Sequence, residues 1–119
     1  MDNKFSQSWL DWNYEKKKKK LTETLELTLK LFKKGDSIEL IAKKRNFKLE
    51  SVQYQIIELI AMSFINISYF LTSDNLREID DIIEKKRPKN LKELREYLNE
   101  KFSFFELKCY LAYLNQIPN

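Results

Sequence analysis

The chain has 119 residues, enough for one compact domain, and its content of 43% hydrophobic and 34% charged residues is typical of a folded helical protein. It contains no histidine, one cysteine and one glycine, which excludes the usual Cys/His metal sites, histidine acid–base catalysis and glycine-rich phosphate loops. Serine or carboxylate chemistry stays formally open. We expect a protein that is not an enzyme and that has no cofactor, no metal and no catalytic residues.

The sequence contains no apolar run approaching the roughly 20 residues that a membrane-spanning helix needs. Its first residues are polar and of mixed charge, unlike the hydrophobic stretch of a signal peptide. The lone cysteine, Cys109, cannot form an internal disulfide and fits a reducing compartment. These features predict a cytoplasmic protein without a membrane partner, associated with the nucleoid if it binds DNA.

Positive charge is concentrated in the first half of the chain. Residues 16–48 carry 12 Lys and Arg against four Asp and Glu, whereas residues 51–119 carry nine against ten. A basic segment joined to a near-neutral remainder is the electrostatic pattern of a nucleic-acid-binding protein, although solvated lysine surfaces are also common. We therefore expect DNA as a partner.

Residues 1–20 are predicted to form a short aromatic and basic arm, and residues 21–119 a helical domain. Phe5, Trp9 and Trp12 have i, i+4, i+7 spacing, so a short helix would align them on one stripe. Five consecutive lysines end the arm. The two tryptophans could stack on nucleic-acid bases or dock on a partner protein. The alternative is that the stripe packs onto the chain's own bundle.

The helical domain opens with a first helix that begins near Thr22. Gly35 is suited to the left-handed position that follows a helix, and Asp36 or Ser37 can cap the next one. This second helix ends near Asn46, which tolerates the geometry of a tight turn. The predicted buried faces are Leu21, Leu25, Thr28, Leu29 and Phe32 in the first helix, and Ile38, Ile41 and Ala42 in the second.

A third helix is predicted over residues 50–62. Its inward-facing positions are Val52, Ile56, Leu59 and Ile60. Two short helices joined by a tight turn describe a helix-turn-helix, here at about residues 37–62. The small side chain of Ala42 would let the second and third helices cross closely.

The rest of the chain is predicted to form a small helical bundle. Residues 65–71 form a connecting stretch, which we interpret as extended, and Cys109 is expected to be a buried hydrophobic residue. The predicted N-caps of the later helices are Thr72 or Ser73, Asn90, and Ser103 in a capping box with Glu106. The expected fold class is all-α, with about five to six helices plus the arm.

Several segments occur in an order typical of one known family. They are LFKKGDSIELIAKKR at residues 31–45, ESVQ at 50–53, the acidic and apolar helix at 74–83, and FSFFELK at 102–108. With these motifs, residues 24–114 resemble the helicase helix-turn-helix domain at the carboxy-terminal end of many RecQ-type and related helicases. The resemblance implies an accessory domain that binds DNA or positions it for a separate motor.

Two positions differ from the pattern of that family. Gln55 stands where histidine is common, so any family contact at this position does not carry over directly. Ser63 stands where a glycine usually ends the third helix. The second difference predicts a different exit from that helix.

In a helix-turn-helix DNA reader the third helix enters the major groove, and its non-core side chains contact the DNA. Here those side chains are Ser51, Gln53, Tyr54 and Gln55. Glutamine can pair with adenine through two hydrogen bonds, and serine or tyrosine can reach phosphates. Two acids on the same helix, Glu50 and Glu58, would repel phosphates, and the interpretation as ordinary solvent-facing residues stays open.

Basic residues around the first two helices and the turn form the second part of the predicted nucleic-acid site. They are Lys33, Lys34, Lys43, Lys44, Arg45 and Lys48. Phosphates that these cations neutralise would release counterions, so affinity would depend strongly on salt. The alternative is a lysine surface that only maintains solubility.

Two functional hypotheses follow from the sequence. The first is a non-catalytic, DNA-binding accessory or regulatory module. The second is a protein-interaction adaptor, or a small transcription regulator, that docks on a helicase or RNA polymerase. The adaptor would use the aromatic arm and the aromatic residues near the end of the chain, which are Phe104, Phe105, Tyr110 and Tyr113.

Overall fold

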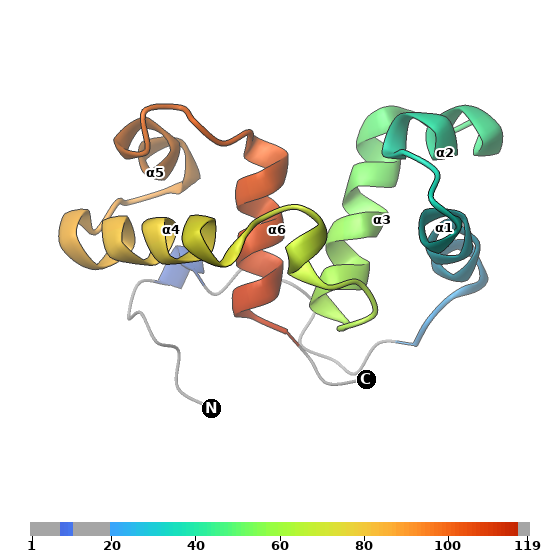
Figure 1. Cartoon of the computed structure of the whole chain (residues 1–119), viewed down its shortest axis with the longest axis horizontal. Coiled ribbons are helices and arrows are strands. Elements are labelled where there is room, and N and C mark those ends of the chain that lie inside the picture. Colours follow the sequence, from blue (N-terminus) through green and yellow to red (C-terminus); the bar gives the residue numbers. More distant parts are fainter. Residues whose placement is uncertain (1–7, 11–19, 117–119) are drawn as a thin grey trace.

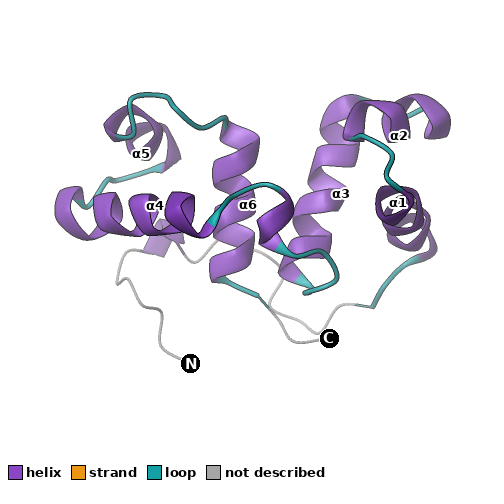
Figure 2. Ribbon diagram, in the orientation of Figure 1, coloured by secondary structure: helices purple, strands orange, loops and turns teal. Residues whose placement is uncertain are grey.

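The computed structural model describes residues 8–10 and 20–116. The helices are η1 (Ser8–Leu10), α1 (Glu23–Lys34), α2 (Ile38–Arg45), α3 (Leu49–Ala61), η2 (Ile67–Tyr69), α4 (Ser73–Lys86), α5 (Leu91–Tyr97) and α6 (Phe104–Leu114). Helices and loops account for all of the described chain, which contains no strand (Figure 2). The predicted all-α fold, a helix-turn-helix followed by a small helical bundle, is therefore confirmed.

The helices are arranged as two flanks around a central pair. Helices α3 and α6 lie side by side at the centre, with α1 and α2 on the α3 side and α4 and α5 on the α6 side (Figure 1). The molecule measures 42 × 30 × 22 Å. Helix α3 therefore packs against three neighbours, α1, α2 and α6, and only part of its surface is open.

Helix α3 contributes the centre of the hydrophobic core. The four side chains predicted to face inward, Val52, Ile56, Leu59 and Ile60, are all fully buried. Burial of a side chain of this size contributes roughly 1.5–3 kcal/mol to stability. Six further side chains from α2, α4, α5 and α6 complete the core with no exposed surface: Ile41, Ile79, Ile83, Leu94, Leu107 and Tyr110.

The turns of the helix-turn-helix follow from capping. Gly35 takes a left-handed conformation with φ of 111° and ends α1 by donating its N–H to Leu31 and Phe32. Ser37, rather than Asp36, caps α2, because its hydroxyl accepts the N–H of Leu40 at 3.1 Å. Three caps later in the chain, Thr72, Asn90 and Ser103, also form as predicted, and Ser103 and Glu106 make the predicted capping box.

Asn46 and Ser63 take left-handed conformations at the two ends of α3. Asn46 has φ of 57° and ends α2 one turn before α3 begins. Ser63 has φ of 67°, the region that glycine favours, so the chain leaves α3 as it would with a glycine. The expectation of a different exit is wrong.

The extended conformation expected for residues 65–71 is also wrong. Residues Ile67–Tyr69 form a 3-10 helix, η2, because the side chain of Asn66 caps the N–H of Ser68 at 2.9 Å. The same turn buries Ile67 and Leu71 against the core, as their apolar character predicts.

Of the predicted arm, the structure describes only the part around η1. Leu10 is fully buried, and its carbonyl oxygen accepts the Nδ2–H of Asn115 at 2.8 Å. Trp9 is half-buried against the core, and its Nε1–H donates to the carbonyl oxygen of Pro88 at 2.9 Å. Phe5, Trp12 and residues 16–19 lie outside the described residues.

Candidate nucleic-acid interface

All six predicted phosphate-contacting cations lie on the lobe formed by α1, α2 and the start of α3. Two end α1, three end α2, and Lys48 is the N-cap of α3. Five are exposed, and Arg45 is half-buried. Cations in the last turn of a helix are also favoured by its dipole, so the five that end α1 and α2 also stabilise their own helices.

Arg45 is bound within the protein. Its Nη1 donates to the carbonyl oxygen of Thr24 at 2.8 Å and to the hydroxyl of Thr28 at 2.6 Å. Its guanidinium also lies over the ring of Phe47, 4.7 Å from the centroid. The structure therefore gives Arg45 a role in holding α2 against α1.

The same network includes Gln55. The fully buried hydroxyl of Thr28 donates to Oε1 of Gln55 while it accepts from Arg45. A hydroxyl can make both bonds at once, so this buried polar group is satisfied. Sequence analysis missed Thr28 as a polar link between three helices, because it placed this residue on an apolar face and could not pair it with distant partners.

Lys44 forms an ion pair with Asp36, with 2.8 Å between Nζ and Oδ2. The hydrogen bond to Asp36 raises the pKa of Lys44 above its usual value. The other four cations, Lys33, Lys34, Lys43 and Lys48, make no ion pair within residues 8–10 and 20–116, and we call them the first basic surface.

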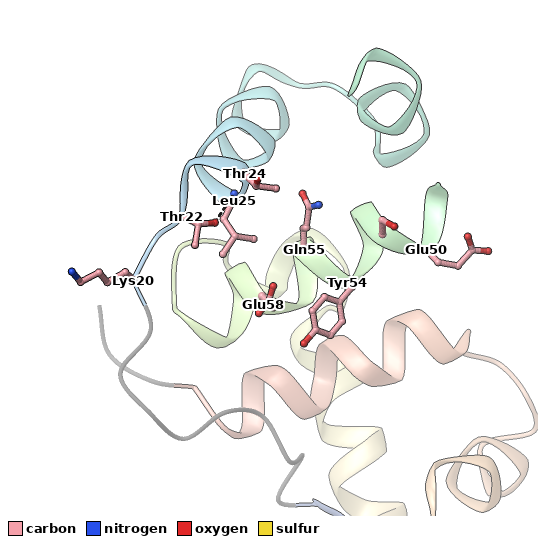
Figure 3. A pocket seen from close by; sticks show the side chains of 9 residues that line it. Lys20, Thr22, Thr24, Leu25, Glu50, Tyr54, Gln55 and Glu58 are labelled. Carbon is pink, nitrogen blue, oxygen red and sulfur yellow. Dashed lines mark hydrogen bonds between the residues drawn. The ribbon is translucent and has the colours of Figure 1, made fainter. Parts of the chain in front are cut away.

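The open part of α3 forms the floor of a shallow depression of about 550 Å³ (Figure 3). Its other wall is the start of α1, with Thr22, Thr24 and Lys20. Gln55 points toward α1, whereas Tyr54 points the other way, toward α6. Glu50 and Glu58 also line the depression, so its floor is more acidic than basic.

Among the predicted contacts on α3, the structure separates exposed side chains from engaged ones. Ser51 and Tyr54 are exposed, Tyr54 to 52%. Gln53 is half-buried and lines a second pocket of about 260 Å³, where α3 meets the first turn of α6. Phe104, Phe105 and Lys108 line the other side of that pocket.

The aromatic residues near the end of the chain are mostly part of the fold. Tyr110 is fully buried, and its hydroxyl donates to Asp80 at 2.6 Å. Phe105 is half-buried against Phe70, with 5.4 Å between ring centroids. Only Phe104 and Tyr113 expose more than a third of their surface. Trp9 likewise packs onto the bundle, which was the alternative interpretation of the tryptophan stripe.

The one cysteine does not have the environment of an activated nucleophile. Cys109 is fully buried, as predicted, and burial raises the pKa of its thiol well above the usual range. Within the described ranges, no three metal-ligating side chains come together. No helix of this part of the chain is long and apolar enough to span a bilayer.

Sequence analysis missed a second cluster of cations. Lys85, Lys86, Arg87, Lys89 and Lys92 surround the turn from α4 to α5, and all five are exposed. The net charge over residues 51–119 did not indicate them, because acidic residues on α4 and α5 offset their positive charge in the total. A shorter window would have detected the cluster.

Comparison with known proteins supports the helix-turn-helix assignment. The chain is 25% identical over 93 residues to Protein YpbB of Bacillus subtilis (strain 168). That alignment covers 77% of this chain and 26% of YpbB, so the chain spans about a quarter of the length of that relative. No solved structure matches the chain significantly. A family model described as a helix-turn-helix domain matches residues 24–111, most of the chain, and the chain therefore belongs to this helix-turn-helix domain family.

Proposed function

We propose that the chain is a non-catalytic module that binds the phosphate backbone of DNA through its helix-turn-helix lobe. The observation that carries this proposal is the first basic surface. Its four exposed lysines surround α2 and the start of α3, and none of them forms an ion pair within the described part of the chain. Each phosphate neutralised by such a lysine releases condensed counterions, which favours binding.

The contacts to DNA are mainly to phosphates. Glu50 and Glu58 on the open part of α3 oppose close approach of a phosphate, and Gln55 is held by Thr28. Ser51 and Tyr54 remain as the exposed uncharged polar side chains in the first two turns of α3. Since phosphate contacts carry no sequence information, we expect weak sequence preference.

The resemblance to the helicase accessory domain supports a role next to a separate motor. In this role the module would hold DNA while another protein, or another part of a longer chain, acts on it. The match to about a quarter of YpbB is compatible with such a module occurring in larger proteins.

The proposal is tested by charge reversal in the first basic surface. We expect K43E/K48E to weaken binding of a labelled duplex at low salt by roughly tenfold or more, because at least two phosphate contacts become repulsive. Lys48 makes no side-chain cap, so its replacement should leave α3 intact. Fluorescence anisotropy measures the affinity, and thermal unfolding checks the fold.

A matched control is R77E/K101E, which changes the net charge equally at exposed positions on α4 and in the turn before α6. Arg77 pairs with Asp74 at 2.8 Å and Lys101 with Glu78 at 2.9 Å, but ion pairs at the surface contribute little to stability, so the fold should be kept. If the two variants bind the duplex equally well, the loss of affinity comes from net charge alone, and a specific binding surface is refuted.

A second candidate function, a protein adaptor that docks on a helicase or RNA polymerase, is favoured by one observation. Tyr54 and Phe104 are both exposed beside the pocket between α3 and α6, and aromatic side chains beside a pocket are typical anchors of protein interfaces. Such an adaptor would bind its partner after nuclease treatment, and K43E/K48E would bind it as well as the original chain.

A further inference from the structure

The turn between α4 and α5 carries a dense group of cations, which we call the second basic surface. Between residues 84 and 93 there are five Lys and Arg and two acids, Glu84 and Glu93. The five cations are Lys85, Lys86, Arg87, Lys89 and Lys92, all exposed. The four lysines of this group repel one another, and a bound anion would relieve that repulsion.

The backbone of this turn is fixed from several directions. Arg87 ends α4 in a left-handed conformation with φ of 45°, and its N–H donates to Ile83. On the other side of the turn, the N–H of Lys89 donates to the carboxylate of Glu93 at 2.7 Å, and Asn90 caps α5. The cations therefore project from a defined backbone rather than from a loose loop.

The third anchor comes from a distant part of the sequence. Pro88 is buried in the middle of the turn, and its carbonyl oxygen accepts the Nε1–H of Trp9 at 2.9 Å. Trp9 itself packs against the core. A tryptophan 79 residues away in sequence thus holds the backbone from which the second basic surface projects.

The two basic surfaces lie at opposite ends of the molecule. Helices α1 and α2 form one end of the 42 Å long dimension, and the C-terminal end of α4 with the turn into α5 forms the other (Figure 1). The acidic first half of α4 and the central helices lie between them. A single phosphate cluster cannot contact both surfaces.

We propose that the second basic surface is a second binding site for the phosphate backbone of nucleic acid, so that one copy of the chain holds two separated stretches of backbone. The nature of the ligand rests on the proposed function. Because the backbone of the turn is already ordered, binding there loses little backbone entropy. Trp9 acts as a positioning residue that touches no ligand.

The test compares K85E/K89E with R77E/K101E, which changes net charge equally, in titrations with a long labelled duplex at several salt concentrations. Two lost contacts should lower the magnitude of the slope of log affinity against log salt by about 1.8. The expected result is a several-fold loss of affinity at low salt and this smaller slope for K85E/K89E, but not for the control.

A second variant separates positioning from stability. Trp9→Phe keeps an aromatic ring but removes the donor to Pro88, so it should weaken duplex binding in the original chain and have no further effect in K85E/K89E. If Trp9→Phe only lowered stability, it would reduce duplex affinity equally in the original chain and in K85E/K89E. That result would refute the positioning role.

The two proposals fail in distinguishable ways. If K43E/K48E weakens binding while K85E/K89E behaves like the control, the second site is refuted and the proposed function stands. If the original chain shows no salt-dependent binding, the proposed function itself is refuted.

Discussion

Arg45, Thr28 and Gln55 form a polar chain that joins three helices. The guanidinium of Arg45 donates to the hydroxyl of Thr28, which donates to the amide oxygen of Gln55. Two of these residues, Arg45 and Gln55, have the chemistry of DNA contacts, and their sequence positions suggest that role. Both are instead held by Thr28, and these bonds form only when α1 packs against α2 and α3.

Replacing Arg45 with alanine should destabilise the fold by about 2 kcal/mol, because it removes two charge-assisted hydrogen bonds to Thr24 and Thr28. Lys43→Ala, on the same helix but exposed and unpaired within the described chain, should change stability by no more than about 0.5 kcal/mol. Denaturant titration of the two variants measures the difference. Equal losses would show that the network does not stabilise the packing of α1 and α2.

The burial of Tyr110 makes the free energy of unfolding depend on pH in the alkaline range. Burial, and then the hydrogen bond to Asp80, raise the pKa of its phenol above the usual value. The neutral phenol is therefore favoured in the folded state. The contribution of Tyr110 to stability is complete below the pKa of about 10 that the phenol has in the unfolded chain, and it is lost as the pH rises above that value. The free energy of unfolding should fall there by up to about 1.4 kcal/mol per pH unit from this residue.

Tyr110→Phe is the control for that dependence. The variant loses the bond to Asp80 and starts less stable, but the part of the alkaline slope due to Tyr110 disappears. Urea titrations between about pH 8 and 11 measure both slopes, with the range set by the ordinary pKa of tyrosine. Identical slopes would contradict the inferred cause.

The ends of the helices were predictable because capping is local. Gly35, Ser37, Asn46, Thr72, Asn90 and Ser103 occupy the cap positions that their side chains favour. Ser63 shows where local preference fails, because a serine takes the left-handed conformation that its identity disfavours. The 3-10 turn at η2 was missed for a related reason, since its apolar residues suit a buried strand equally well.

Gly35→Ala tests the first turn of the helix-turn-helix. No atom would meet an added Cβ within 4 Å, so the cost is that of a left-handed alanine alone, about 1 kcal/mol. Gly35→Asn should lose less, because asparagine tolerates this conformation. Thermal unfolding of both variants measures the order. An alanine variant as stable as the asparagine one would contradict the assigned backbone geometry.

At the scale of the whole molecule, function depends on where charges gather after folding. The sequence indicated a basic first half, and the structure shows that Lys44 and Arg45 are engaged inside that half while four lysines stay available. It also places a second group of cations at the far end of the long dimension, which averaging over the second half had concealed. The sequence alone gives neither the engagement of Lys44 and Arg45 nor the position of the second group of cations. Both depend on how the helices pack.

If lysines of the helix-turn-helix lobe bind DNA phosphates, the affinity for duplex DNA must fall as the salt concentration rises. Four contacts predict a slope of log affinity against log salt of about −3.6 or steeper, a loss of roughly a hundredfold between about 50 and 200 mM salt. A slope shallower than about −1, or no measurable binding at low salt, would contradict the claim.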